Sequence, residues 1–235
     1  MWQQPRSLFP TRCVVCPSPA RAGLVALLFQ EFNISDIKIH PNFNNATLVN
    51  DIALLKLERP AKRQQNIDVV CVANTEDIDE SRLSNCYVTG WGRRTESSEH
   101  STVLKEITVP LWEQTVCNSA LQDQFGPGYS LPSSSVCAGA EGRDACDGDG
   151  GGPLVCQQAG QWYQVGIVSF GIGCGRAGVP GVYTRVSTFY PWLERTILSN
   201  KKRRRSLWET RWEWCLVLYR GHEYQQYIVI TKYLQ

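Results

Sequence analysis

The stretch Asp144-Ala-Cys-Asp-Gly-Asp-Gly-Gly-Gly-Pro-Leu-Val-Cys156 decides the fold of this chain. It contains a loop rich in glycine and aspartate with a cysteine on either side, and it ends in the apolar pair Leu154-Val155 after Pro153. Loops of this composition often bind calcium or simply turn the chain. Neither role requires the cysteines, the proline or the apolar pair. The stretch therefore indicates a more specific motif.

The cysteine content predicts an oxidising compartment. Ten cysteines in 235 residues are typical of a secreted protein stabilised by disulfides and are dense for a cytosolic one. Cys13 and Cys16 have the C-x-x-C spacing of a zinc knuckle or a redox pair, but the sequence has no second such pair and no H-x-x-x-H to complete a zinc site. We therefore expect no metal and no other cofactor.

Two further features concern secretion. Residues 1–29 contain three arginines and four prolines before a short apolar stretch, which makes a poor signal peptide. Asn33-Ile-Ser35 and Asn45-Ala-Thr47 are sequons that are compatible with glycosylation in a secretory lumen. The cysteines, rather than a leader, carry the prediction of a secreted, extracellular protein.

Hydropathy and charge exclude two classes of function. The longest apolar run, Ala22–Phe29, has eight residues, far fewer than a membrane-spanning helix needs. The run Lys201–Arg205 supplies five positive charges, so without it the net charge falls from +2 to −3. The chain thus has no distributed basic surface, and we expect it to bind no nucleic acid.

Residues 31–190 read as short β-rich runs separated by glycine, proline, asparagine and aspartate. We expect strands at Ile37–His40, Ala53–Leu57, Cys86–Thr89, Gln161–Phe170 and Gly181–Val186. Apolar residues at helical spacing in Thr188–Leu198 predict a short closing helix. This pattern favours an all-β barrel or sandwich.

The glycine-rich stretch resembles the nucleophile loop of trypsin-like serine proteases, whose pattern is D-x-C-x-G-D-S-G-G-P-L-V-C. Further blocks agree with that family in the same order: Asn50–Leu57, Gly90–Gly92, Val168–Gly171 and Pro180–Thr184. The resemblance implies an all-β, trypsin-like double β-barrel with an incomplete first barrel, an intact second barrel and a C-terminal helix. We expect an unmatched segment 1–29, a partial trypsin-like domain 30–198, and an unmatched basic, tryptophan-containing tail 199–235.

The resemblance also implies a disulfide pattern. It pairs Cys86 with Cys156, Cys117 with Cys137, and Cys146 with Cys174. Cys71 resembles the cysteine that tethers an N-terminal extension in this family, so Cys13, Cys16 or no cysteine is its partner here. Cys215 has no counterpart in the family.

Catalysis in this family needs a nucleophilic hydroxyl, a histidine that takes its proton, and a buried carboxylate that orients the histidine. Asp51 matches the carboxylate, as a vestige, but Gly150 stands at the nucleophile position. The histidine expected forty to fifty residues before Asp51 is missing, and His40 lies only eleven residues before it. We therefore expect no catalysis.

Some parts of the site do not depend on these residues. The resemblance assigns the oxyanion hole to the backbone N–H groups of Gly148 and Gly150. It assigns a pocket for a basic side chain to Asp144, Ser169, Gly171 and Gly181. The alternative is a pocket that never forms. Asp149 matches the carboxylate that pairs with a cleaved N-terminus in active relatives; here it should stay exposed or find another donor.

The departures from the family are similar to those of the clip-domain serine protease homologues of arthropods. That resemblance implies a non-catalytic adaptor or cofactor for other proteases or zymogens of an extracellular cascade, such as prophenoloxidase activation and melanisation in innate immunity. Two alternatives stay open: a trypsin-like endopeptidase misread at residue 150, and an incomplete gene model in which residues 1–29 and 201–235 are not genuine. Lys201–Arg205 reads as a solvated or artefactual tail, with a heparin-like polyanion site as the alternative.

Overall fold

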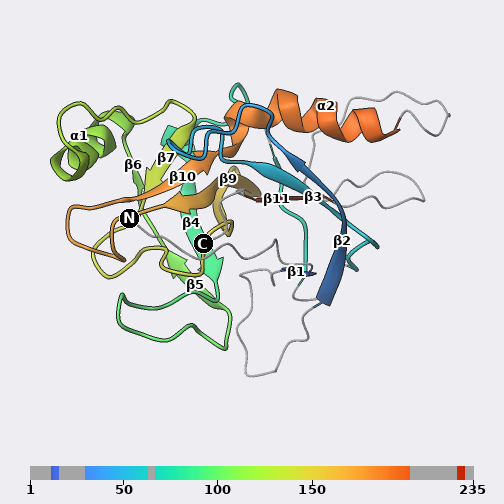
Figure 1. Ribbon diagram of the computed structural model, residues 1–235, viewed down its shortest axis with the longest axis horizontal. Helices are drawn as coiled ribbons and strands as arrows, with labels where there is room; N and C mark the ends of the chain where they lie inside the picture. Colours follow the sequence, from blue (N-terminus) through green and yellow to red (C-terminus); the bar gives the residue numbers. More distant parts are fainter. Residues whose placement is uncertain (1–11, 16–29, 63–66, 73, 202–226, 231–235) are drawn as a thin grey trace.

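The computed structural model describes residues 12–15, 30–62, 67–72, 74–201 and 227–230 (Figure 1). Cys16, Cys215, residues 202–205 of the basic run and the three tail tryptophans lie outside these ranges. The described chain is mostly strands, and its two α-helices lie at opposite ends of Figure 1.

Seven antiparallel strands form the larger sheet, which corresponds to the second barrel. In sheet order they are β5 (Lys105–Thr108), β4 (Ser84–Gly90), β8 (Pro153–Gln158), β9 (Gln161–Phe170), β10 (Gly181–Arg185), β7 (Ser135–Ala138) and β6 (Leu111–Trp112). The 12-residue helix α1 (Gln114–Phe125) connects β6 to β7. Its Cys117 and Leu121 are buried in a cluster with Leu131, Cys137 and Val182.

Four strands form the smaller sheet, in the order β1 (Arg12–Val15), β2 (Gln30–Ile39), β3 (Ala53–Leu57) and β11 (Tyr227–Ile230). This sheet corresponds to the incomplete first barrel. The sequence predicts β3 with these bounds, and it predicts only the last part of β2. Neither β1 nor β11 is predicted, because each lies in a segment without a clear hydrophobic period.

Strand β3 links the smaller sheet to the core. Leu54 is fully buried against a cluster that includes Ile167 of β9 and Leu193 of the closing helix. Ala53 and Leu55 face the other way and pack with isoleucines of β2. Side chains alternate between the faces of a strand, so a run apolar on both faces, as here, is buried on both.

The closing helix α2 (Tyr190–Lys201) follows a 3-10 turn, Val186–Phe189. The helix is therefore shifted toward the C-terminus relative to the predicted Thr188–Leu198. Pro191 lies in its first turn, where a backbone N–H has no partner within the helix and its absence is tolerated. The helix covers the core with Leu193 and Ile197.

Three disulfides join the pairs that the resemblance implies: Cys86–Cys156, Cys117–Cys137 and Cys146–Cys174. Each native disulfide of a secreted domain contributes about 2–5 kcal/mol to stability. Cys71 is also disulfide-bonded, to a cysteine whose side chain lies outside the described part of the chain.

Candidate functional site

The loop between β7 and β8 carries Asp144, Gly148, Asp149 and Gly150. The Cys146–Cys174 disulfide joins this loop to the segment that follows β9. Within the loop, the Asp149 N–H donates to the Cys146 carbonyl at 3.0 Å, and the Gly152 N–H donates to the Asp149 carbonyl at 2.8 Å. The loop is thus held as a series of tight turns against the second barrel.

Gly148 has a φ of +91°, a conformation that glycine adopts without strain. The N–H groups of Gly148 and Gly150 donate to no protein acceptor within the described ranges, as an oxyanion hole would require. The His100 ring lies against this turn, because a Cβ on Gly148 would be 2.8 Å from its Nε2. Residue 150 itself contributes only backbone.

The Asp149 carboxylate is held by backbone donors. It accepts hydrogen bonds from the N–H groups of Gly92, at 2.8 Å, and of Cys146, at 3.0 Å. A Cβ on Gly90 would lie 1.9 Å from its Oδ1, so the carboxylate occupies the space that glycine leaves at both ends of Gly90–Gly92. Burial raises the pKa of Asp149, and the two N–H donors oppose that rise. The sequence left two alternatives for Asp149, an exposed carboxylate or a carboxylate bound by another donor, and the structure has the second.

Asp51 is fully buried directly before β3. The Ser169 hydroxyl donates to its Oδ2 at 2.8 Å, and the Thr184 hydroxyl donates to its backbone carbonyl at 2.8 Å. Asp51 is therefore tied to β9 and β10 of the larger sheet, and this contact joins the two sheets at the site.

His40 lies at the end of β2 and packs on aromatic rings. Its ring centroid is 5.3 Å from that of Phe189 and 5.1 Å from that of Trp192. Its Nδ1 accepts the N–H of Asn42 at 3.3 Å. Burial lowers the pKa of His40, which favours the neutral ring in an aromatic contact.

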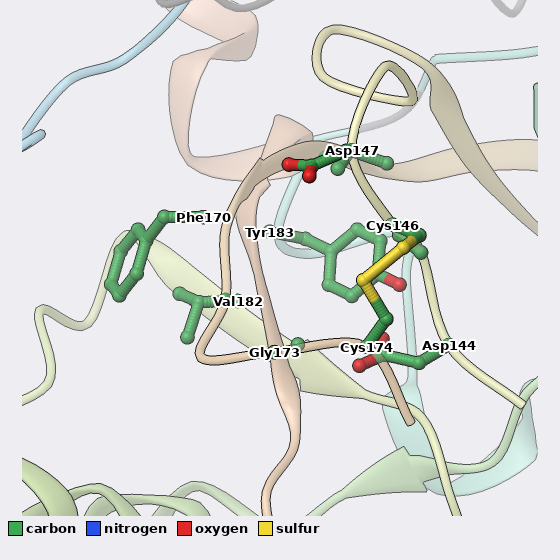
Figure 2. A pocket seen from close by; sticks show the side chains of 12 residues that line it. Asp144, Cys146, Asp147, Phe170, Gly173, Cys174, Val182 and Tyr183 are labelled. Atoms are coloured by element: carbon green, nitrogen blue, oxygen red, sulfur yellow. A yellow bond between two sulfur atoms is a disulfide. The ribbon is translucent and has the colours of Figure 1, made fainter. Parts of the chain in front are cut away.

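A small pocket lies beside the loop, lined by parts of segments 144–147, 168–174 and 181–183 (Figure 2). Figure 2 shows the Tyr183 ring between Phe170 on one side and the Cys146–Cys174 disulfide on the other. The cavity volume is about 20 Å³, which accommodates a water molecule and excludes a lysine or arginine side chain. The structure thus has a pocket, but one too small for such a side chain.

The Asp144 carboxylate is buried in this pocket with one oxygen unpaired. Its Oδ2 accepts the Gly175 N–H at 3.2 Å, whereas Oδ1 and the Tyr183 hydroxyl find no hydrogen-bond partner among the described residues. A Cβ on Gly181 would lie 2.6 Å from Oδ1. Burial, reinforced by the charge of Asp149, raises the pKa of Asp144 to about 7.

Of the four residues assigned to a pocket for a basic side chain, Asp144, Gly171 and Gly181 line this cavity and Ser169 does not. Alternation along β9 turns Val168 and Phe170 toward the pocket and Ser169 toward Asp51. Sequence reasoning missed Tyr183, although it lies in the block Pro180–Thr184.

The predicted glycosylation sites differ in their surroundings. Asn33 is exposed on β2, where its side chain donates to Glu58 at 2.8 Å. Asn45 is exposed in a turn whose backbone N–H groups are capped by the neighbouring Asn44 side chain. Neither sequon is therefore hidden by packing.

Within the described ranges, no group of three or more histidine, cysteine, aspartate or glutamate side chains is placed to hold a metal ion. In that same part of the chain, no helix has the length and apolar character that crossing a bilayer demands.

The family model described as Trypsin matches residues 28–193. Protein masquerade of Drosophila melanogaster is 40% identical over 172 residues, which make up 73% of this chain and 16% of that relative. Inactive CLIP domain-containing serine protease A3 of Aedes aegypti is 38% identical over 173 residues, 71% of this chain and 36% of the relative. Phenoloxidase-activating factor 2 of Galleria mellonella is 38% identical over 173 residues, 71% of this chain and 57% of the relative.

The chain thus spans between 16% and 57% of the length of these relatives. The family match takes in strands β2 to β10 and every residue that lines the pocket. On this match the chain belongs to the trypsin family.

Proposed function

We propose that this chain is a secreted, non-catalytic serine protease homologue that acts by binding, as an adaptor or cofactor for other proteases or zymogens of an extracellular cascade. Residues 30–198 form its trypsin-like domain and carry this role. The segments 1–29 and 199–235 flank that domain. The cascade is of the innate immune type that leads to prophenoloxidase activation.

The observation that carries the proposal is Gly150, in the position where the family has its nucleophilic serine. Glycine has no side chain, so it forms no acyl intermediate. Loss of the nucleophile from such a site lowers turnover by about a millionfold. The backbone donors that remain give a residual rate about a thousandfold or more above that of water, which is far below that of a working protease.

Three further observations agree with a binding role. The Asp51 carboxylate accepts the Ser169 hydroxyl, and its backbone carbonyl accepts the Thr184 hydroxyl, so Asp51 stabilises the contact between the sheets. The pocket excludes the basic side chain that a trypsin-like substrate would insert. Two of the relatives carry the words inactive protease and phenoloxidase-activating factor in their names.

The absence of catalysis is tested on the whole chain with a fluorogenic arginine peptide and a serine-directed phosphonate. We expect neither turnover nor labelling. The variant Gly150→Ser adds the hydroxyl and should remain silent, since this sequence has no histidine at the expected spacing before Asp51. Turnover by the unaltered chain that the phosphonate blocks would refute the proposal and favour a trypsin-like endopeptidase.

The cofactor role is tested with purified arthropod prophenoloxidase and its activating protease. We expect the chain to raise the rate at which phenoloxidase activity appears. A trypsin with its nucleophile replaced by alanine serves as a control for the fold alone. An unchanged rate, together with no binding to either component by biolayer interferometry, would contradict the role.

A further inference from the structure

An ion pair joins two segments that are far apart in sequence and lies against backbone that lines the pocket. The Arg176 guanidinium donates from Nε to Oε1 of Glu96 at 2.7 Å and from its NH2 group to Oε2 at 2.8 Å. This two-pronged geometry is the strongest form of an arginine–carboxylate pair. The hydrogen bonds from Arg176 lower the pKa of Glu96 to about 2, so the pair stays charged at physiological pH.

The pair is built into the wall of the pocket. Glu96 Oε1 also accepts the backbone N–H of Cys174, at 3.2 Å. A Cβ on Gly173 would lie 2.2 Å from Arg176 Nε and 2.3 Å from Glu96 Oε1, so the pair packs directly on this glycine. Gly173 and Cys174 both line the cavity, and Figure 2 shows them along one side of it.

The pocket-wall segment against which the ion pair packs is fixed at both of its ends. Strand β9 ends at Phe170, and the Cys146–Cys174 disulfide fixes the far end. Between them lie Gly171, Ile172 and Gly173, and the glycines allow the backbone to rearrange with little steric resistance. The contacts of Glu96 therefore act on a stretch of the pocket wall whose glycines let it shift.

We propose that the Glu96–Arg176 ion pair is a latch that keeps the pocket narrow, and that these two residues determine whether a ligand can enter. With the pair intact, segment 171–176 lies against the cavity and leaves about 20 Å³. With the pair broken, the segment moves outward and a compact organic cation reaches Asp144. This inference goes beyond the proposed function, since it holds whether or not the chain serves as a cofactor.

The test compares single variants that break the pair with variants that change the same charges elsewhere in the loop. Glu96→Gln and Arg176→Gln break it. The controls are Glu99→Gln and Arg94→Gln, which remove one charge each from exposed residues of the same loop that make no ion pair within the described ranges. The double variant Glu96→Arg/Arg176→Glu reverses the pair.

Hydrogen exchange of the peptide that covers residues 171–179 is the first readout, and binding of the fluorescent cation p-aminobenzamidine is the second. A surface ion pair shifts such an equilibrium by about two- to fivefold. We expect exchange to be faster and binding tighter by that factor in both single variants. The controls should match the unaltered chain. The reversed pair should restore part of the slower exchange and the weaker binding of the unaltered chain. Raising NaCl to 1 M should weaken the latch in the unaltered chain, because it shortens the screening length to about 3 Å.

The latch is refuted if both single variants exchange and bind like the unaltered chain. It is also refuted if exchange and binding change as much in the controls as in the two single variants, since the effect would then be one of net charge. Both side chains of the pair are partly exposed, at 51% for Arg176 and 39% for Glu96, so the variants should fold. None of these readouts measures cofactor activity or turnover, so failure of the latch leaves the proposed function standing, and the reverse is also true.

Discussion

Replacing Asp144 with asparagine should stabilise the fold at neutral and alkaline pH. The carboxylate is buried in a cavity with room for little more than water, and no hydrogen-bond partner of its Oδ1 lies in the described part of the chain. A buried charge without full compensation is costly. Asparagine keeps the shape of the side chain and removes the charge.

The magnitude follows from the pKa. In the unfolded chain the Asp144 carboxyl ionises near its ordinary value of 3.8, whereas in the fold burial raises its pKa to about 7. A group whose pKa is raised by folding contributes its full stability below the unfolded value and loses it as pH rises through the folded one. At 1.36 kcal/mol per pH unit, the loss between those two values is about 4 kcal/mol. The advantage of the variant should therefore be close to zero near about pH 4 and about 4 kcal/mol near about pH 8.

The assay is denaturant unfolding of both proteins at several pH values between those two limits. Asp123→Asn on helix α1 is the matched control, because Asp123 is exposed and its replacement should leave the free energy of unfolding nearly unchanged. A difference between Asp144→Asn and the unaltered chain that does not grow with pH would refute the reasoning. Destabilisation at the alkaline end would do the same.

Three further predictions concern packing and modification. Gly92→Ala should lower the free energy of unfolding, measured by urea titration, by about 2–4 kcal/mol, since its Cβ would lie 2.5 Å from the Asp149 Cγ and displace hydrogen bonds to a charged carboxylate. Gly128 has open space around it, so Gly128→Ala should leave that free energy nearly unchanged. Leu54→Ala should cost about 2–5 kcal/mol in that titration, because Leu54 is fully buried. Asn45→Gln should remove one glycan from the intact mass of protein made in a secretory pathway, because Asn45 lies in an exposed turn; an unchanged mass would contradict this.

The parts of the fold that the sequence predicts are those with a local signal. Ala53–Leu57 and Gln161–Phe170 have the bounds expected from their apolar runs. The closing helix is found with its start displaced by two residues, because Val186–Phe189 forms a tighter turn first. Strands β1 and β11 have no periodic pattern and exist through their partners β2 and β3, which sequence reasoning does not provide.

The site divides in the same way. The motif locates Asp144, Gly148 and Gly150, because their spacing is local. The proposed latch consists of Glu96 and Arg176, which are separated by 80 residues and belong to no sequence motif. Likewise, the groups that donate to the Asp149 carboxylate are backbone N–H groups, which have no sequence signature. Only Gly90 and Gly92, whose missing side chains leave space for the carboxylate, indicate its position.

The pairing of β3 with β11 has a consequence for biosynthesis. Tyr227 lies opposite Lys56, so nearly all of the trypsin-like region is translated between the two partners. At ribosomal rates of about 5–20 residues per second, β3 waits about 10–30 s for its second neighbour. During that interval a strand that is apolar on both faces presents an open edge, the kind of surface that pairs with other chains. Production of this protein should therefore depend on chaperones that shield nascent chains, more than its small size suggests.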